Sequence, residues 1–238
     1  LATERVSRVR AGHRLRVHPL TRAVQADPGQ PGGQGGVSAG AGRGAPRRRG
    51  DAIPCGPAML LLRPATLHDL PALHAIERSA TELYYEEGFS PAQVDPRSEA
   101  DMRLLLKYTT VLLACDDDEP IGYASFYTRG PFLHLEEIAV RRDRQRRGCG
   151  KALAQQALAE ARADLQCTHL SLVTFSSAHW AVEMYSRLGF RFLDPGETLP
   201  QIDLLQEIVE IEAAACLTCP PRVPMILTVR PPPPEPAA

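Results

Sequence analysis

The segment Phe132–Leu153, FLHLEEIAVRRDRQRRGCGKAL, constrains the fold more than any other part of the chain. An apolar run of strand-like composition leads directly into a basic loop with two glycines, and a helical pattern follows. Backbone N–H groups at a helix N-terminus favour a negatively charged ligand, and glycines let the backbone approach it closely. The segment therefore predicts a strand–loop–helix unit that binds a phosphate or pyrophosphate group. In that loop Arg146 and Arg147 lie beside Gly148 and Gly150.

Two common phosphate-binding motifs are excluded by single residues of this loop. A nucleoside-triphosphate loop would have glycine where the chain has Gln145, and Ser or Thr where it has Ala152. A dinucleotide fingerprint would have a third glycine where the chain has Leu153. Gly-Cys-Gly alone is therefore a weak indication of a Rossmann fold.

Two ordered motifs together are more specific than this loop alone. Residues 145–150 have the pattern Gln-x-x-Gly-x-Gly, and the block 171–193 contains MYSRLGF at residues 184–190. The first resembles the acetyl-CoA-binding motif of the GNAT superfamily of N-acetyltransferases, and the second resembles the superfamily's "FYxxxGF" ending. The resemblance covers roughly residues 59–229. It implies an α/β (α+β) fold with a mixed, mostly antiparallel sheet of about six to seven strands flanked by helices.

The resemblance also implies an activity and a co-substrate. It suggests an N-acetyltransferase in which an amine attacks acetyl-CoA directly, without a covalent enzyme intermediate and without a metal. The backbone of three strand residues would pair with the pantetheine arm: Ile138, Ala139 and Val140. The loop and first helical turn would hold the pyrophosphate: Gln145, Arg146, Arg147, Gly148, Cys149, Gly150 and Lys151.

Amide formation from a thioester needs a base for the amine and a proton for the departing thiolate. Strand alternation sends Glu136 and Glu137 to opposite faces, so we expect only one of them in the cleft. The resemblance favours Glu137 as base, because the family often has an acidic residue three positions before the valine that ends this strand. It likewise makes Tyr185 the general acid near the CoA sulfur. Each also has a purely structural alternative: Glu137 could only order water or pair with a loop arginine, and Tyr185 could only pack its ring on the core.

One departure from the family pattern weakens the prediction of an enzyme. Related sequences often have asparagine where this chain has Ala181, which puts cofactor affinity or orientation in doubt. A catalytically degenerate acyl-CoA-binding sensor or scaffold is therefore the alternative function. We interpret Trp180, the only tryptophan, as a packing residue. A helix N-terminus would lower the pKa of Cys149, although we expect no thiolate role for it.

Residues 1–58 differ from the rest of the chain. They contain ten Arg, no Lys and three acidic residues, a net charge of +7 that the remainder balances with −8. Rich in Gly and Pro, they have few large apolar residues with which to form a core. They are either a disordered leader or upstream sequence preceding a true start at Met59; a transit peptide is a third option. A nucleic-acid-binding arm is a rival function, but no aromatic residue interleaves the arginines.

The overall charge and composition limit the locations and partners that we expect. The net charge of −1 gives no reason to expect nucleic acid or a membrane as partner. No apolar run is long enough for a membrane span or a secretory signal, so we expect a cytoplasmic protein with reduced cysteines. The pair Cys216 and Cys219 has no second pair to complete a zinc site. We expect a small-molecule or peptide amine substrate, whose identity remains open, as does a homodimer.

Periodicity predicts the other elements of the domain. Thr66 should cap a helix that ends near Tyr85, and a second helix is expected near residues 97–107. Strands near 109–115 and 120–127 should flank a solvated acidic turn. A core stripe is expected at Leu153, Ala157, Ala161 and Leu165. Further elements are expected at 168–174, 178–188, 190–193, 201–215 and 222–229, the last at a sheet edge or bulge because it contains Pro224. Residues 230–238 form a Pro-rich tail.

Overall fold

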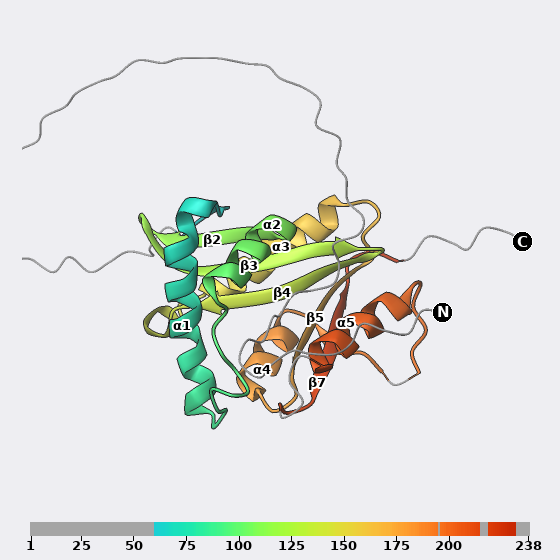
Figure 1. The fold of residues 1–238 in the computed structure, drawn as a ribbon. Helices are drawn as coiled ribbons and strands as arrows, with labels where there is room; N and C mark the ends of the chain where they lie inside the picture. Colours follow the sequence, from blue (N-terminus) through green and yellow to red (C-terminus); the bar gives the residue numbers. More distant parts are fainter. Residues whose placement is uncertain (1–59, 195, 215–218, 232–238) are drawn as a thin grey trace, which may run out of the picture.

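The computed structural model describes residues 60–194, 196–214 and 219–231. A seven-stranded sheet in the order β1-β2-β3-β4-β5-β7-β6 forms its centre (Figure 1). The strands are β1 Leu60–Pro64, β2 Thr110–Asp116, β3 Glu119–Arg129, β4 Phe132–Val140, β5 His169–Phe175, β6 Arg191–Phe192 and β7 Arg222–Thr228. Only β4 and β5 run parallel to each other. The prediction of a mixed, mostly antiparallel sheet of six to seven strands is confirmed.

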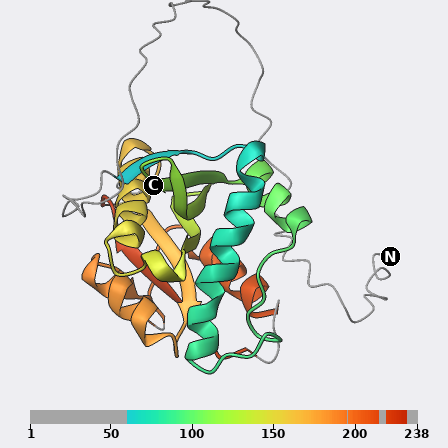
Figure 2. The same cartoon turned by 90° about the vertical axis from the view of Figure 1, so that its left-hand side faces the viewer.

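Five α-helices in the described residues cover both faces of the sheet. They are α1 Leu70–Glu86, α2 Glu99–Tyr108, α3 Cys149–Ala163, α4 His179–Arg187 and α5 Ile202–Ala214. Helices α1, α2 and α5 lie on one face, and α3 and α4 lie on the other (Figures 1 and 2). Leu153, Ala157 and Ala161 are buried in the core beneath α3, as predicted. The prediction for Leu165 is wrong: α3 ends before it, and its side chain is 78% exposed.

The middle of β4 contains a β-bulge that shapes the rest of the domain. Ser125 of β3 pairs with Glu137, but the next β3 residue, Phe126, pairs with Leu135. Glu136 is therefore an extra residue without a partner on β3. Beyond this point β4 also loses β5, because their pairing runs only as far as Leu135 and Leu172. Strand β5 continues instead along β7, so the sheet opens between β4 and β5.

The shortness of the edge strand β6 explains how β7 accommodates a proline. Pro224 pairs with Val173 of β5, whereas the two-residue strand β6 pairs only with Met225 and Ile226 of β7. On the other side the carbonyl of Pro224 accepts a hydrogen bond from the N–H of Leu193, just past the end of β6. Strand β7 thus lies between β5 and β6, so the prediction of an edge or bulge position is wrong; the missing N–H of the proline falls where the short strand β6 ends. The predicted leader 1–58, Cys216 and most of the predicted tail lie outside the described residues. None of the helices in the described residues is both long and apolar enough to span a membrane.

Candidate active site

A cleft of about 880 Å³ opens where β4 and β5 diverge. Its walls come from the end of β4, the glycine loop, the start of α3, the second half of β5, and the helices α1 and α4. The predicted site residues that line it are Glu137, Ile138, Ala139, Val140, Gln145, Arg146, Gly148, Cys149, Gly150, Lys151 and Tyr185. Arg147 is exposed and is not among the lining residues. The fold thus brings together two sequence blocks that are separated by most of α3 and β5.

The glycine loop has a backbone suited to an anion. Gly148 is the N-cap of α3 and has a φ of +89°, a left-handed conformation that explains why glycine occupies this position. Arg146 has a φ of +60°, and successive N–H groups near such residues can form a concave anion-binding surface. Arg146 and Lys151 are exposed and form no ion pair with any described residue. Backbone and side chains therefore both favour negative charge at this end of the cleft.

Acidic residues from neighbouring elements hold the loop in place. Arg144 forms ion pairs with Asp116 at 2.9 Å and with Glu119 at 2.6 Å, and Arg141 also pairs with Glu119. The acidic turn 116–119 is the exposed tip of the β2–β3 hairpin, as predicted, and its two outer carboxylates also form ion pairs with the loop arginines. Their physical role is to neutralise the first arginines of the loop. On the opposite side Arg142 pairs with Glu86 of α1 at 2.7 Å.

The exposed edge of β4 offers backbone groups to the cleft. The N–H of Arg141 donates to the carbonyl of Ile121 on β3 at 2.9 Å. Hydrogen-bonding groups alternate along an antiparallel strand, so the backbone of Ala139 faces β3, while those of Ile138 and Val140 face the cleft. The carbonyl of Val140 accepts a bond from Gln145 Nε2 at 3.0 Å. Of the three predicted strand residues, Ile138 and Val140 are thus placed to bind an extended ligand.

Cys149 does not have the properties that its position in the sequence suggests. Its thiol points into the core beneath β3, where a Cβ atom added at Gly122 would come within 2.9 Å of the sulfur. Burial raises the pKa of Cys149 to about 11. The expected lowering by the helix N-terminus is therefore outweighed by loss of solvent, and only the backbone of Cys149 is available to a ligand.

Glu136 and Glu137 of β4 both line the cleft, so the expectation that they point to opposite faces of the sheet is wrong. The bulge is the cause, because the extra residue interrupts the strict alternation of side chains. Arg97 Nη1 lies 3.0 Å from Glu137 Oε2, and Arg97 Nη2 lies 3.5 Å from Glu136 Oε1. Burial raises the pKa of Glu136, although the Arg97 guanidinium opposes this shift.

Arg97 organises the site and was missed by sequence reasoning. It lies in the loop before α2 and is only 7% exposed. Its guanidinium also pairs with Glu77 of α1 at 3.1 Å, and the hydroxyl of Tyr123 donates to Glu77 at 2.6 Å. Burial alone would raise the pKa of Glu77, but Arg97 and these hydrogen bonds bring it below its ordinary value. No local pattern marks Arg97, since its partners are 20 to 40 residues away.

Tyr185 both packs on the core and lines the cleft. Its ring meets Phe190 edge-on at 5.7 Å between centroids. Burial raises the pKa of its hydroxyl well above the ordinary value, with further contributions from Tyr84 and Glu137. The hydroxyl therefore stays protonated at neutral pH, and it shares the cleft with Glu137.

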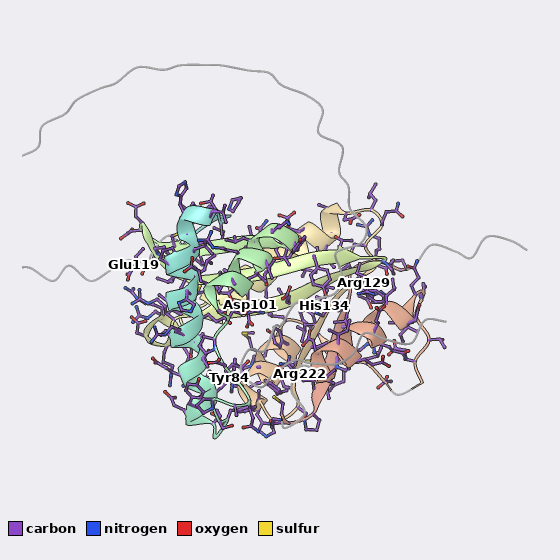
Figure 3. The ribbon with its side chains drawn as sticks, in the orientation of Figure 1. Tyr84, Asp101, Glu119, Arg129, His134 and Arg222 are labelled. Atoms are coloured by element: carbon purple, nitrogen blue, oxygen red, sulfur yellow. The ribbon has the colours of Figure 1, made fainter. Side chains whose placement is uncertain are left out.

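Aromatic side chains form one wall of the cleft. Tyr84 makes edge-on contacts with Phe89, Phe175 and Trp180 at 5.4–6.0 Å between centroids. Tyr84 lies on α1, on the same side of the domain as Arg222 of β7 (Figure 3). Trp180 packs as predicted but also lines the cleft, as do Tyr84 and Phe175. Ala181 lies in the same wall and is 3% exposed, so the position at which the resemblance led us to expect asparagine lines the cleft.

Comparisons with known proteins identify the family and the fold. Residues 73–190 match the model of a family described as the acetyltransferase (GNAT) family. A search of curated proteins gave no match.

Within the described residues, no group of three or more His, Cys, Asp or Glu side chains is arranged to hold a metal ion.

Several solved structures share the fold. The ribosomal-protein-S18-alanine N-acetyltransferase of Escherichia coli superimposes with a TM-score of 0.54 and 20% identity, over 76% of this chain and 100% of that one. The PaiA N-acetyltransferase of Thermoplasma acidophilum, in complex with coenzyme A, superimposes with a TM-score of 0.55 and 13% identity, over 71% of this chain and 98% of that one. The N-acetylglutamate synthase of Neisseria gonorrhoeae, complexed with coenzyme A and N-acetyl-glutamate, superimposes with a TM-score of 0.52 and 16% identity, over 73% of this chain and 36% of that one. At these identities the likeness establishes the fold.

Proposed function

Residues 73–190 belong to the GNAT acetyltransferase family, as the sequence motifs predicted, and from this premise we propose that the protein transfers an acetyl group from acetyl-CoA to an amine. One observation carries the proposal: a single cleft joins the glycine loop, the open edge of β4, Tyr185 and Glu137. An extended thioester needs all of these along one path. Solved structures of the same fold that contain coenzyme A give further support.

In this proposal the loop and β4 position the co-substrate. The N–H groups at the start of α3, together with Arg146 and Lys151, bind the pyrophosphate. The backbone of Ile138 and Val140 holds the pantetheine arm as an added strand would be held. The bulge at Glu136 interrupts the pairing with β3, and pairing with β5 stops at Leu135, next to the point where the thioester would lie. Binding along this path orients the carbonyl for attack.

The chemistry then needs one base and one acid. Glu137, held by Arg97, takes the proton that the amine loses, directly or through a water molecule. The amine attacks the thioester carbon, and the C–S bond breaks as the amide forms. Tyr185 supplies the proton to the departing thiolate, a role for which a neutral buried phenol is suited.

Calorimetric titration of acetyl-CoA into the full chain tests the proposal. Wild type should bind saturably, and Gly148→Glu should lose binding, because a carboxylate there would repel the pyrophosphate. Gly196→Glu is the matched control, since Gly196 has a similar φ of +83° and likewise has no atom within 4 Å of an added Cβ. Equal loss in both variants, or no binding by a folded wild type, would refute the proposed cofactor site.

Tyr185→Phe tests the catalytic step separately. We expect acetyl-CoA affinity to stay within about twofold, while turnover falls by about 10²-fold or more, as for loss of a general acid. Unchanged turnover would remove Tyr185 from the mechanism. Acetyl-CoA binding without turnover of any amine by wild type would instead support the alternative of an acyl-CoA sensor, for which Ala181 is the relevant departure.

A further inference from the structure

The end of the cleft away from the glycine loop contains more carboxylates than cations. Glu77, Glu136 and Glu137 all surround Arg97, whose guanidinium lies within 3.0–3.5 Å of each. Asp95 also lines this end and forms no ion pair within the described part of the chain. Three buried or partly buried carboxylates therefore share one guanidinium, which leaves an excess of negative charge.

The other cation at this end is already neutralised. Arg222 donates to Glu212 Oε2 at 2.6 Å, and its guanidinium lies over the ring of Phe175 at 4.4 Å. His134 is fully buried, with Nε2 3.6 Å from Glu212 Oε1 and Nδ1 3.1 Å from Ser171 Oγ. Glu212 thus lies beside both Arg222 and His134; His134 favours the charged form of Glu136 only in part, and Glu212 opposes it. The pKa of Glu136 is still raised, because burial and the neighbouring carboxylates outweigh the effects of Arg97 and His134.

A buried hydroxyl points to a polar partner at the same place. Ser125 is 0% exposed, and its Oγ has no hydrogen-bond partner among the described residues. It pairs in register with Glu137 and shares a sheet face with Tyr123, whose hydroxyl bonds Glu77. Ser125 Oγ therefore faces the carboxylate group. A donor bound among these carboxylates would satisfy it.

The neighbouring aromatic wall favours the same kind of ligand. The rings of Tyr84 and Trp180 line the cleft beside the acidic end. Aromatic faces attract cations, most strongly when solvent is excluded. Carboxylates and aromatic rings together suit an ammonium group on an apolar spacer, and they disfavour a carboxylate.

We propose that the acceptor is a diamine or polyamine, in which one amine is acetylated beside Glu137 while a second, charged ammonium binds at Glu136 and Glu77 beside the aromatic wall. This inference rests on the proposed acetyltransferase function. The reactive amine loses its proton to Glu137, whereas the second ammonium stays protonated and neutralises the excess carboxylate charge.

Three four-carbon acceptors that differ only at the far end test the inference. They are 1,4-diaminobutane, butylamine and 4-aminobutanoate, which carry an ammonium, a methyl and a carboxylate group. Release of CoA thiol from acetyl-CoA gives kcat/KM for each, and calorimetry on the CoA-bound protein gives their affinities. We expect 1,4-diaminobutane to exceed butylamine by about tenfold or more, and 4-aminobutanoate to be the poorest acceptor.

Glu136→Gln should remove the preference and leave the fold intact. It keeps the shape of the side chain, and Arg97 retains Glu77 and Glu137 as partners. We expect kcat/KM for the diamine to fall about tenfold and that for butylamine to change little. Because the charged form of Glu136 is penalised by burial, the variant should also be at least as stable as wild type at neutral pH. Glu160→Gln, an exposed carboxylate on α3, is the control and should change neither value.

The outcomes separate this inference from the function on which it rests. Failure to bind acetyl-CoA would refute the proposed function. If acetyl-CoA bound normally but butylamine or 4-aminobutanoate were used as well as the diamine or better, only the diamine inference would be refuted. The same conclusion would follow if acetyl-CoA bound normally and the diamine were neither bound nor acetylated. An unchanged preference in Glu136→Gln would show that this carboxylate does not bind the second ammonium.

Discussion

A methyl group added at Gly150 should separate acetyl-CoA binding from folding. An ideal Cβ at Gly150 would lie 3.6 Å from Met184 Sδ and 3.8 Å from the Cγ2 atoms of Ile138 and Val140. These are ordinary van der Waals contacts, so alanine fits without displacing a neighbour. Alanine is favoured over glycine in a helix by up to about 1 kcal/mol, and less in a first turn. We therefore expect the free energy of unfolding of Gly150→Ala to equal or slightly exceed that of wild type.

Cofactor binding should respond in the opposite direction. The methyl group would stand between Met184 of α4 and the side chains of β4, within the path assigned to the pantetheine arm. Forcing extra atoms into a filled site typically costs about 1–3 kcal/mol. At about 1.4 kcal/mol per factor of ten, this weakens acetyl-CoA binding about 5- to 150-fold. Calorimetric titration measures the affinity, and urea denaturation measures the stability.

Gly148 provides the contrasting case. Its φ of +89° would strain any other residue, although no atom lies within 4 Å of an added Cβ. Gly148→Ala should therefore lose about 1–2 kcal/mol of stability, and Gly196→Ala, with a φ of +83°, should lose a similar amount. If Gly150→Ala bound acetyl-CoA as tightly as wild type, the cofactor could not pass between β4 and α4, and the assignment of the cleft would fail.

Three further predictions concern stability, reactivity and pH. Arg97→Leu should cost about 3–5 kcal/mol in urea denaturation, because it leaves buried carboxylates without their cation, whereas Arg103→Leu, which breaks an exposed pair, should cost less than about 0.5 kcal/mol. Cys149, with its pKa raised to about 11, should resist alkylation at pH 8 in the native protein and react on unfolding, as peptide mass spectrometry would show. The hydrogen bond from Arg191 lowers the pKa of Glu197 from 4.5 to about 2, so this pair stabilises the fold above pH 4.5 and is lost as the pH falls towards 2. Glu197→Gln should thus be less stable by under about 1 kcal/mol at pH 7 and should approach wild type below pH 2; a constant difference would contradict the assignment.

The order and type of the elements could be predicted because they depend on local patterns. Apolar periodicity in α1 and α3, the strand composition of β4 and the glycines after it each act over a few residues. The helix after Gly148 starts where the glycine pattern predicted, since only glycine takes its φ of +89° without strain. The predicted bounds of the loops and short strands also lay close to the observed ones, because turn residues mark them.

The remaining features depend on pairing between distant residues. Arg97 lies in a loop with no motif, and its role follows only from the meeting of that loop with α1 and β4. The acidic turn near Glu119 and the loop arginines were visible as separate charge runs, but their contact depends on the fold. The thiol of Cys149 has a raised pKa because it is packed beneath Gly122, a residue 27 positions earlier.

The β4 bulge links fold and chemistry most directly, and it also could not be predicted. A regular strand would have placed Glu136 and Glu137 on opposite faces and left one of them outside the cleft. The extra residue turns both towards Arg97, and at the same position β4 separates from β5. The opening of the cleft and the acidic group beside it therefore arise from one irregularity. In the proposed function, β4 diverges from β5 beside these carboxylates, so acetyl-CoA and the amine would lie next to each other, as direct transfer between them requires.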